Sequence, residues 1–116
     1  MTSIIKKSTL TPAALTASTA TYYTCPVNTR ARILKVTVAN VDTATRAFIG
    51  YLVPSGGSAG ATNNVTPSQT IVVNEARDIF EMEGQSLEAN GTVQGKVDAI
   101  TTTAPNIYIT VLETTV

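Results

Sequence analysis

Two apolar runs between residues 31 and 53 constrain the fold of this chain more than any other feature. In the first run Leu34, Val36 and Val38 alternate with mixed residues, which predicts a strand with one aliphatic face. The second run, 46–53, is apolar on both faces, so something outside its own sheet is expected to cover one of them. Asn, Asp and Thr side chains at 40–45 favour a turn. The simplest prediction is a β-hairpin.

The composition extends this prediction to the whole chain. Threonine is nearly a fifth of the residues and, with Val and Ile, makes the sequence strongly β-branched, which suits a pleated surface. A length of 116 residues fits one domain. Hydrophobic residues at 43% against charged residues at 14% indicate a folded chain. We therefore expect an all-β protein.

Further short strands are separated by turn signals. Residues 21–26 predict a short strand that ends at Pro26, and Asn90-Gly91 precedes an alternating run at 92–98. A last strand is expected at 107–113, with its Ile and Val residues facing inward. Seven or eight such strands predict a single-domain antiparallel β-sandwich or jelly roll. Residues 1–19 are expected to form an arm or edge strand and a polar loop, and residues 20–116 the sandwich.

Residues 70–84 fit two interpretations. Their apolar side chains have helical spacing, which allows an amphipathic helix of about three turns. Alternatively, strands over 70–73 and 77–80 turn at Asn74-Glu75. We favour the strands because the neighbouring segments are all β.

The sequence shows no catalytic constellation. It contains no histidine, and its single cysteine, Cys25, is expected to be a buried apolar side chain. The glycine-rich segment 53–60 lacks the lysine of a phosphate-binding loop. Glu81 and Glu83 could bind calcium or act as acid and base, but no metal-ligand spacing accompanies them, so we favour a solvated or subunit-facing acidic patch. We expect no enzyme activity, no cofactor and no metal.

The charges sum to zero but are segregated along the chain. Most basic residues precede residue 59, where Asp42 is the one acid, and the other acids follow it. The simpler interpretation is that the two halves neutralise each other within one domain. The alternative is that a basic edge of one copy meets an acidic edge of a neighbour in a ring. No long run of one sign predicts a nucleic-acid partner, and no segment reaches the length that would predict a membrane partner.

Three short segments carry a resemblance to a known family. They are Tyr23-Thr24-Cys25-Pro26, the run Leu-Val-Pro-Ser-Gly-Gly at 52–57, and the corner Leu-Glu-Ala-Asn-Gly at 87–91. From Ala20 onward the chain resembles a widespread group of small virion proteins of tailed bacteriophages. The aspartate that often follows the corner glycine in that group is replaced here by Thr92.

The resemblance implies a non-enzymatic capsid decoration or cement protein. Such a protein is expected to bind the major capsid protein on the outside of the virion as a homotrimer, after synthesis in the host cytoplasm. Two alternatives stay open at this point. One is a tail, neck, baseplate or fibre-base component. The other is a carbohydrate-binding module, which requires one exposed groove lined by Tyr22, Tyr23, Tyr51 and Tyr108.

The N-terminal residues Ile4, Ile5, Lys6 and Lys7 are candidates for an interaction surface. We expect them to dock as an ordered arm onto the capsid or a sister subunit.

The second apolar run supplies the other candidates. Phe48 and Leu52 are expected at an intersubunit face, with Arg46 paired to Glu81 or Glu83 across the contact.

Overall fold

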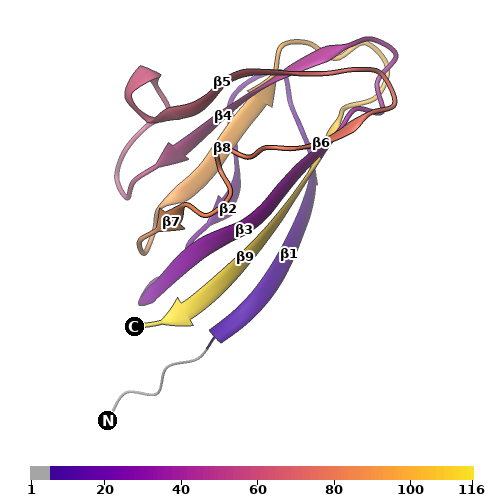
Figure 1. Cartoon of the computed structure of the whole chain (residues 1–116). Helices are drawn as coiled ribbons and strands as arrows, with labels where there is room; N and C mark the ends of the chain where they lie inside the picture. Colours follow the sequence, from indigo (N-terminus) through magenta and orange to yellow (C-terminus); the bar gives the residue numbers. More distant parts are fainter. Residues whose placement is uncertain (1–5) are drawn as a thin grey trace.

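The structure, a computed structural model, describes residues 6–116 as two antiparallel β-sheets stacked face to face (Figure 1). The five-stranded sheet has the order β1 (Lys6–Ala14), β9 (Asn106–Thr115), β3 (Thr29–Ala39) and β6 (Ala76–Asp78), with β7 (Ser86–Leu87) also paired to β3. The four-stranded sheet has the order β2 (Ala20–Thr24), β8 (Thr92–Val97), β4 (Arg46–Val53) and β5 (Asn64–Ile71), and a single 3-10 turn, η1 (Ala61–Asn63), precedes β5. The predicted all-β antiparallel sandwich is confirmed, with nine strands among these residues.

The predicted hairpin between the two apolar runs is wrong. β3 pairs with β9, whereas β4 pairs with β8 and β5, so residues 40–45 carry the chain from one sheet to the other. The two runs face each other across the core instead of lying side by side. The physical reason is that strands distant in the sequence occupy the edges, β9 on β3 and both β8 and β5 on β4, so the apolar faces of the two runs are buried by stacking of the sheets.

A β-bulge in β3 reverses the face expected for one leucine. Ile33 pairs with Val111 and Lys35 with Thr110, so Leu34 is an extra residue without a position in the ladder. Ile33 is fully buried and Leu34 is 45% exposed, the opposite of the expected arrangement. A bulge shifts the two-residue alternation by one, and sequence periodicity does not reveal it.

Phe48 lies in the core, not at the surface position expected for it. Its side chain is fully buried, and its ring crosses the cross-strand pair Gly50 and Gly95. A Cβ atom added to Gly95 would lie 2.9 Å from Phe48 Cε1 and 2.9 Å from the Ile49 carbonyl oxygen. The Phe48 ring therefore occupies the space that a Cβ atom at either position would fill.

The two C-terminal strands confirm their predicted inner faces. Val93 and Val97 of β8 and Ile107, Ile109 and Val111 of β9 are all buried.

The strand interpretation of residues 70–84 is confirmed over the helical one. β5 ends at Ile71, the chain turns through Asn74 with a positive φ of 64°, and β6 begins at Ala76. Residues 79–85 then form a turn beside the bulge of β3, where the Ile79 N–H donates to the Val36 carbonyl (2.8 Å).

A buried polar network holds the crossing between the sheets. Asp42 accepts hydrogen bonds from the N–H groups of Thr43 (2.8 Å) and residues 101–103 (2.8–3.2 Å) and from Arg46 Nε (2.9 Å). Asn40 accepts from the Asp42 N–H (3.0 Å) and donates to the Ile71 carbonyl (2.9 Å). The network ties three loops together at one end of the sandwich.

A second buried contact joins the sheets directly. The Tyr23 hydroxyl, on β2, donates to Glu113 Oε2, on β9, at 2.5 Å. Burial and the nearby Glu113 carboxylate raise the pKa of Tyr23 well above its usual range, because a phenolate here would lose water and face a like charge.

We expect Tyr23→Phe to lower the free energy of unfolding by about 2 kcal/mol at neutral pH, the usual cost of losing a hydrogen bond to a charged group. Because the folded-state pKa of Tyr23 is raised, its contribution is present below pH ~10 and is lost as the pH rises further. Urea titrations of both proteins between pH 7 and 11 measure this. The loss of stability above pH ~10 should be smaller in the variant, and equal losses would contradict the assignment.

Candidate interaction surfaces

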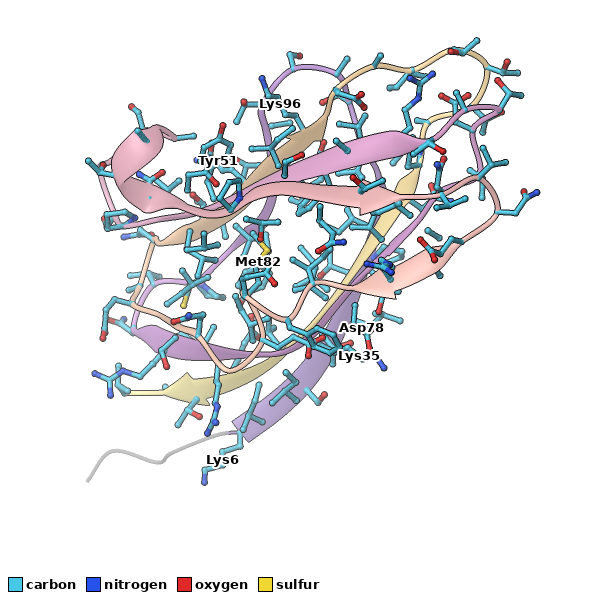
Figure 2. The ribbon with its side chains drawn as sticks, turned by 45° about the horizontal axis from the view of Figure 1, so that its top comes forward. Lys6, Lys35, Tyr51, Asp78, Met82 and Lys96 are labelled. Carbon is cyan, nitrogen blue, oxygen red and sulfur yellow. The ribbon has the colours of Figure 1, made fainter. Side chains whose placement is uncertain are left out.

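The outer surface of the five-stranded sheet combines apolar and basic side chains. Cross-strand pairing aligns outward residues in rows over β1, β9 and β3, for example Lys6 with Thr114 and Arg30. We call this surface the basic face, and its side chains are Lys6, Leu10, Arg30, Arg32, Leu34, Lys35, Tyr108 and Leu112. In Figure 2, Lys6 and Lys35 lie beside this sheet, Met82 lies between the layers, and Tyr51 and Lys96 lie on the opposite sheet.

Large apolar side chains occupy the middle of the basic face. Leu10 on β1 is 60% exposed, the bulged Leu34 on β3 is 45% exposed, and Tyr108 on β9 is 37% exposed. Thr110 stands between Leu10 and Lys35 in one row, and Tyr108 stands in the next row. Neighbouring exposed apolar side chains of this kind typically mark a contact surface.

The charges on this face are unbalanced. Two of its cations pair with acids from the opposite edge of the sheet, Arg30 with Glu88 (3.2 Å) and Lys35 with Asp78 (3.6 Å). Both pairs join the basic first half of the chain to the acidic second half, which supports the simpler interpretation of the charge segregation. Being exposed, each pair adds little stability. The four cations nevertheless give the face a positive potential.

An acidic surface lies at the other edge of this sheet. Residues 79–85, which we call the acidic turn, connect β6 to β7 beside β3. Phe80 projects from it with 72% of its surface exposed, next to the exposed Glu81. Glu83 is half-buried, and its Oε2 accepts a hydrogen bond from the Val36 N–H at 3.3 Å. The turn thus presents an aromatic ring beside carboxylates.

Arg46 lies away from the acidic turn. It is 8% exposed, its Nε is 2.9 Å from Asp42 Oδ2, and it also donates to the Thr101 hydroxyl. A side chain held in this way is not at a surface where Glu81 or Glu83 of another copy could reach it. The predicted ion pair fails because Arg46 has a partner four residues away in its own chain.

The other candidate residues are spread over several places. Lys6 belongs to the basic face. Lys7 pairs through its backbone with Glu113, and its side chain lies outside the description. Ile4 and Ile5 lie outside the described residues. Leu52 is half-buried at an end of the sandwich.

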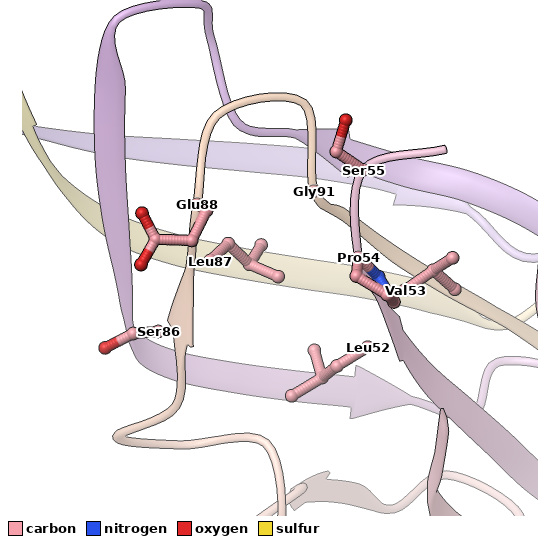
Figure 3. A pocket seen from close by; sticks show the side chains of 8 residues that line it. All are labelled: Leu52, Val53, Pro54, Ser55, Ser86, Leu87, Glu88 and Gly91. Carbon is pink, nitrogen blue, oxygen red and sulfur yellow. The ribbon is translucent and has the colours of Figure 1, made fainter. Parts of the chain in front are cut away.

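A small cavity at this end lies between β4 and the corner after β7 (Figure 3). Its volume is about 190 Å³, below the range of ordinary small-molecule sites. It is lined by Leu52, Val53, Pro54, Ser55, Ser86, Leu87, Glu88 and Gly91. The titratable group in this lining, Glu88, is exposed and paired with Arg30. The cavity therefore holds no catalytic arrangement.

The tyrosines do not form a carbohydrate groove. Tyr23 is in the core, Tyr108 is on the basic face, and Tyr51 is on the opposite sheet. Tyr22 is half-buried, and its hydroxyl accepts a hydrogen bond from the Thr16 N–H at 3.0 Å. The arrangement argues against a carbohydrate-binding module.

Other classes of site find no support in the described part of the chain. Cys25 is buried, and burial raises the pKa of its thiol. Among residues 6–116, no three His, Cys, Asp or Glu side chains are placed to hold a metal ion. The same residues include no helix with the length and hydrophobicity needed to cross a membrane.

The sequence did not single out Leu10, Leu34 or Phe80 as surface residues, and it named Tyr108 only as a candidate for a carbohydrate groove. Leu34 faces outward because of the bulge in β3, and nothing in the sequence pattern indicates that bulge. The exposure of Phe80 could have been predicted, because an aromatic residue within an acidic segment is a poor candidate for a core position.

Comparison with known proteins identifies the fold. No family model matches the sequence, and no curated protein does. A chain from the acidic stable capsid structure of Helicobacter pylori bacteriophage KHP30 has a TM-score of 0.56 and 13% identity, covering 97% of this chain and 93% of that one. A chain from the structure of Bacillus endospore appendages, which form a family of disulfide-linked pili, has a TM-score of 0.53 and 16% identity, covering 97% of this chain and 87% of that one. Both neighbours belong to large protein assemblies.

Proposed function

We propose that this chain is a non-enzymatic structural protein of a phage virion, most specifically a decoration or cement protein that binds the outer capsid as a homotrimer. The observation that carries the proposal is the basic face. The core of the sandwich is already closed by two sheets, yet Leu10, Leu34 and Tyr108 remain exposed together. An apolar surface that the domain does not need for its own folding is a surface for a partner.

The fold and the sequence support the same proposal independently. The fold is shared over nearly the whole chain with a chain of a phage capsid. The segments at 23–26, 52–57 and 87–91 resemble virion proteins of tailed phages. A small domain can gain stability in such an assembly by sharing roughly 1,500 Å² at each contact, although area alone does not determine affinity.

The N-terminal residues are the proposed link to the major capsid protein. Ile4 and Ile5 precede β1, and Lys6 and Lys7 begin it. Deletion of residues 1–5 is the suitable test because it leaves β1 and its pairing with β9 in place.

We expect the full chain to co-sediment with capsids that lack it and to give density at threefold or quasi-threefold positions in electron micrographs. The 1–5 deletion should weaken binding at least tenfold while its thermal unfolding stays unchanged. Density confined to the tail would contradict the decoration role. Unchanged binding of the deletion variant would refute the arm but leave the role intact.

The pilus neighbour favours a second candidate function, a tail, neck, baseplate or fibre-base component. Subunits that bind head to tail form closed rings if the rotation closes and filaments if it does not. Filaments of the purified chain would support this candidate, whereas discrete trimers would support the capsid role.

A further inference from the structure

We propose that the acidic turn of one copy docks on the basic face of a second copy, with Phe80 entering the apolar centre formed by Leu10, Leu34 and Tyr108. This inference deepens the proposed function, because it names the contact that would join the copies of the oligomer.

The two surfaces match in chemistry. The basic face is apolar in its middle and carries Lys6, Arg30, Arg32 and Lys35 around it. The acidic turn has the complementary pattern, an exposed ring beside carboxylates. Association would bury an aromatic side chain and bring opposite charges together at the rim. This arrangement gives both affinity and specificity.

The two surfaces also lie where a head-to-tail contact needs them. The five-stranded sheet runs from β1 through β9 to β3 and then to β6 and β7. Leu10 and Lys6 lie on the β1 edge, and Phe80 lies in the turn at the opposite edge, which borders the basic face at Leu34. Each copy can therefore offer one surface to each of two neighbours. Such a contact between unlike surfaces closes into a ring when the rotation allows it.

Charge argues against a symmetric contact. If two basic faces packed on each other around a twofold axis, the cations of both copies would meet with few acids between them. Like charges brought together in this way oppose association. The acidic turn, carried by the same chain, is the partner of opposite sign.

The test is the mass of the purified full chain, measured by light scattering and sedimentation across concentration and salt. Arg32→Glu and Glu81→Lys should each raise the dissociation constant about tenfold, and the double variant should recover most of the loss because it restores opposite charges. Phe80→Ser should raise the constant ~30-fold or more, with little salt dependence.

Matched controls separate these effects from general ones. Lys96→Glu makes a comparable basic-to-acidic change on the opposite sheet, and Val27→Ser removes a similarly exposed apolar side chain, 67% exposed. Both controls should associate like the wild type. All the changed side chains except Lys96 are mainly exposed, so thermal unfolding should stay near the wild-type value.

Three results would overturn the inference. A wild-type chain that stays monomeric up to ~1 mM has no such contact. Association that survives Arg32→Glu, Glu81→Lys and Phe80→Ser uses other surfaces. A monomeric chain whose particle binding is lost in these variants uses the basic face for the capsid protein instead. The mass measurement contains no particles, so its failure leaves the decoration role to be judged by co-sedimentation with capsids, the separate assay that also measures the particle binding of these variants.

Discussion

Asp42→Asn is expected to lower the melting temperature by more than ~10 °C, because it leaves a buried guanidinium without its charge partner. Asp42 is buried and accepts five hydrogen bonds from N–H groups, four from backbone and one from Arg46. Asparagine has the same shape, but its amide presents a donor where these groups require an acceptor. The change therefore removes the ion pair with Arg46 and places the NH2 group of the asparagine against N–H groups that are themselves donors.

Asp98→Asn is the matched control. It makes the same chemical change at an exposed residue near the same loop, where Asp98 Oδ1 accepts one hydrogen bond, from the Ala47 N–H (3.0 Å). The asparagine oxygen can accept that bond, so its stability should change by less than about 0.5 kcal/mol. Thermal unfolding followed by circular dichroism compares the two variants. Equal, small shifts would contradict the structural role of Asp42.

The pH dependence of stability gives Asp42 a second signature. Hydrogen bonds from backbone N–H groups, with those of Thr101 and Thr102 the strongest, hold the pKa of its carboxyl far below the usual range. The unfolded chain therefore takes up this proton first, and the stability that Asp42 contributes is complete above pH ~4 and is lost as the pH falls. Asp42→Asn should lose less stability than the wild type between pH 5 and 2.

Gly95→Ala is expected to lower the free energy of unfolding by about 2–3 kcal/mol. The added methyl group would lie 2.9 Å from the Ile49 carbonyl oxygen and from Phe48 Cε1. The carbonyl belongs to a strand of the same sheet and cannot yield without distorting the pairing of β4 with β8. Urea unfolding measures the loss.

Two further glycine variants make the test specific. The atoms nearest to a Cβ at Gly50 belong to side chains, Met82 Cε at 2.5 Å and Phe48 Cε2 at 2.8 Å. These side chains can shift more easily than the Ile49 carbonyl, so Gly50→Ala should cost less than Gly95→Ala. Gly60→Ala is the control, because its Cβ would meet nothing within 4 Å and its φ of −172° suits any residue. A comparable loss at Gly60 would show that crowding by Phe48 is not the cause.

Local alternation was sufficient to predict the strands that lack irregularities. The buried faces of β8 and β9 follow from the two-residue period around Val93, Val97, Ile107 and Ile109, because each of these side chains alternates with a more exposed one. The same local patterns, with the β-branched composition, were sufficient to predict an all-β antiparallel sandwich. At 70–84 the local pattern also allowed a helix, and the β character of the neighbouring segments favoured strands.

Only the tertiary structure decided how the strands meet and which side chains remain outside. The predicted hairpin was wrong because two strands with apolar faces can either pair or stack. The choice depends on partners distant in the sequence, β9 for β3 and β8 for β4. Leu34 faces outward because a bulge in β3 matches the turn at 79–85. Phe48 is inside because two glycines, 45 residues apart in sequence, pair beneath its ring. Sequence periodicity indicates which residues of one strand share a face. Burial depends on the side chains that pack on that face from the neighbouring strands and the opposite sheet.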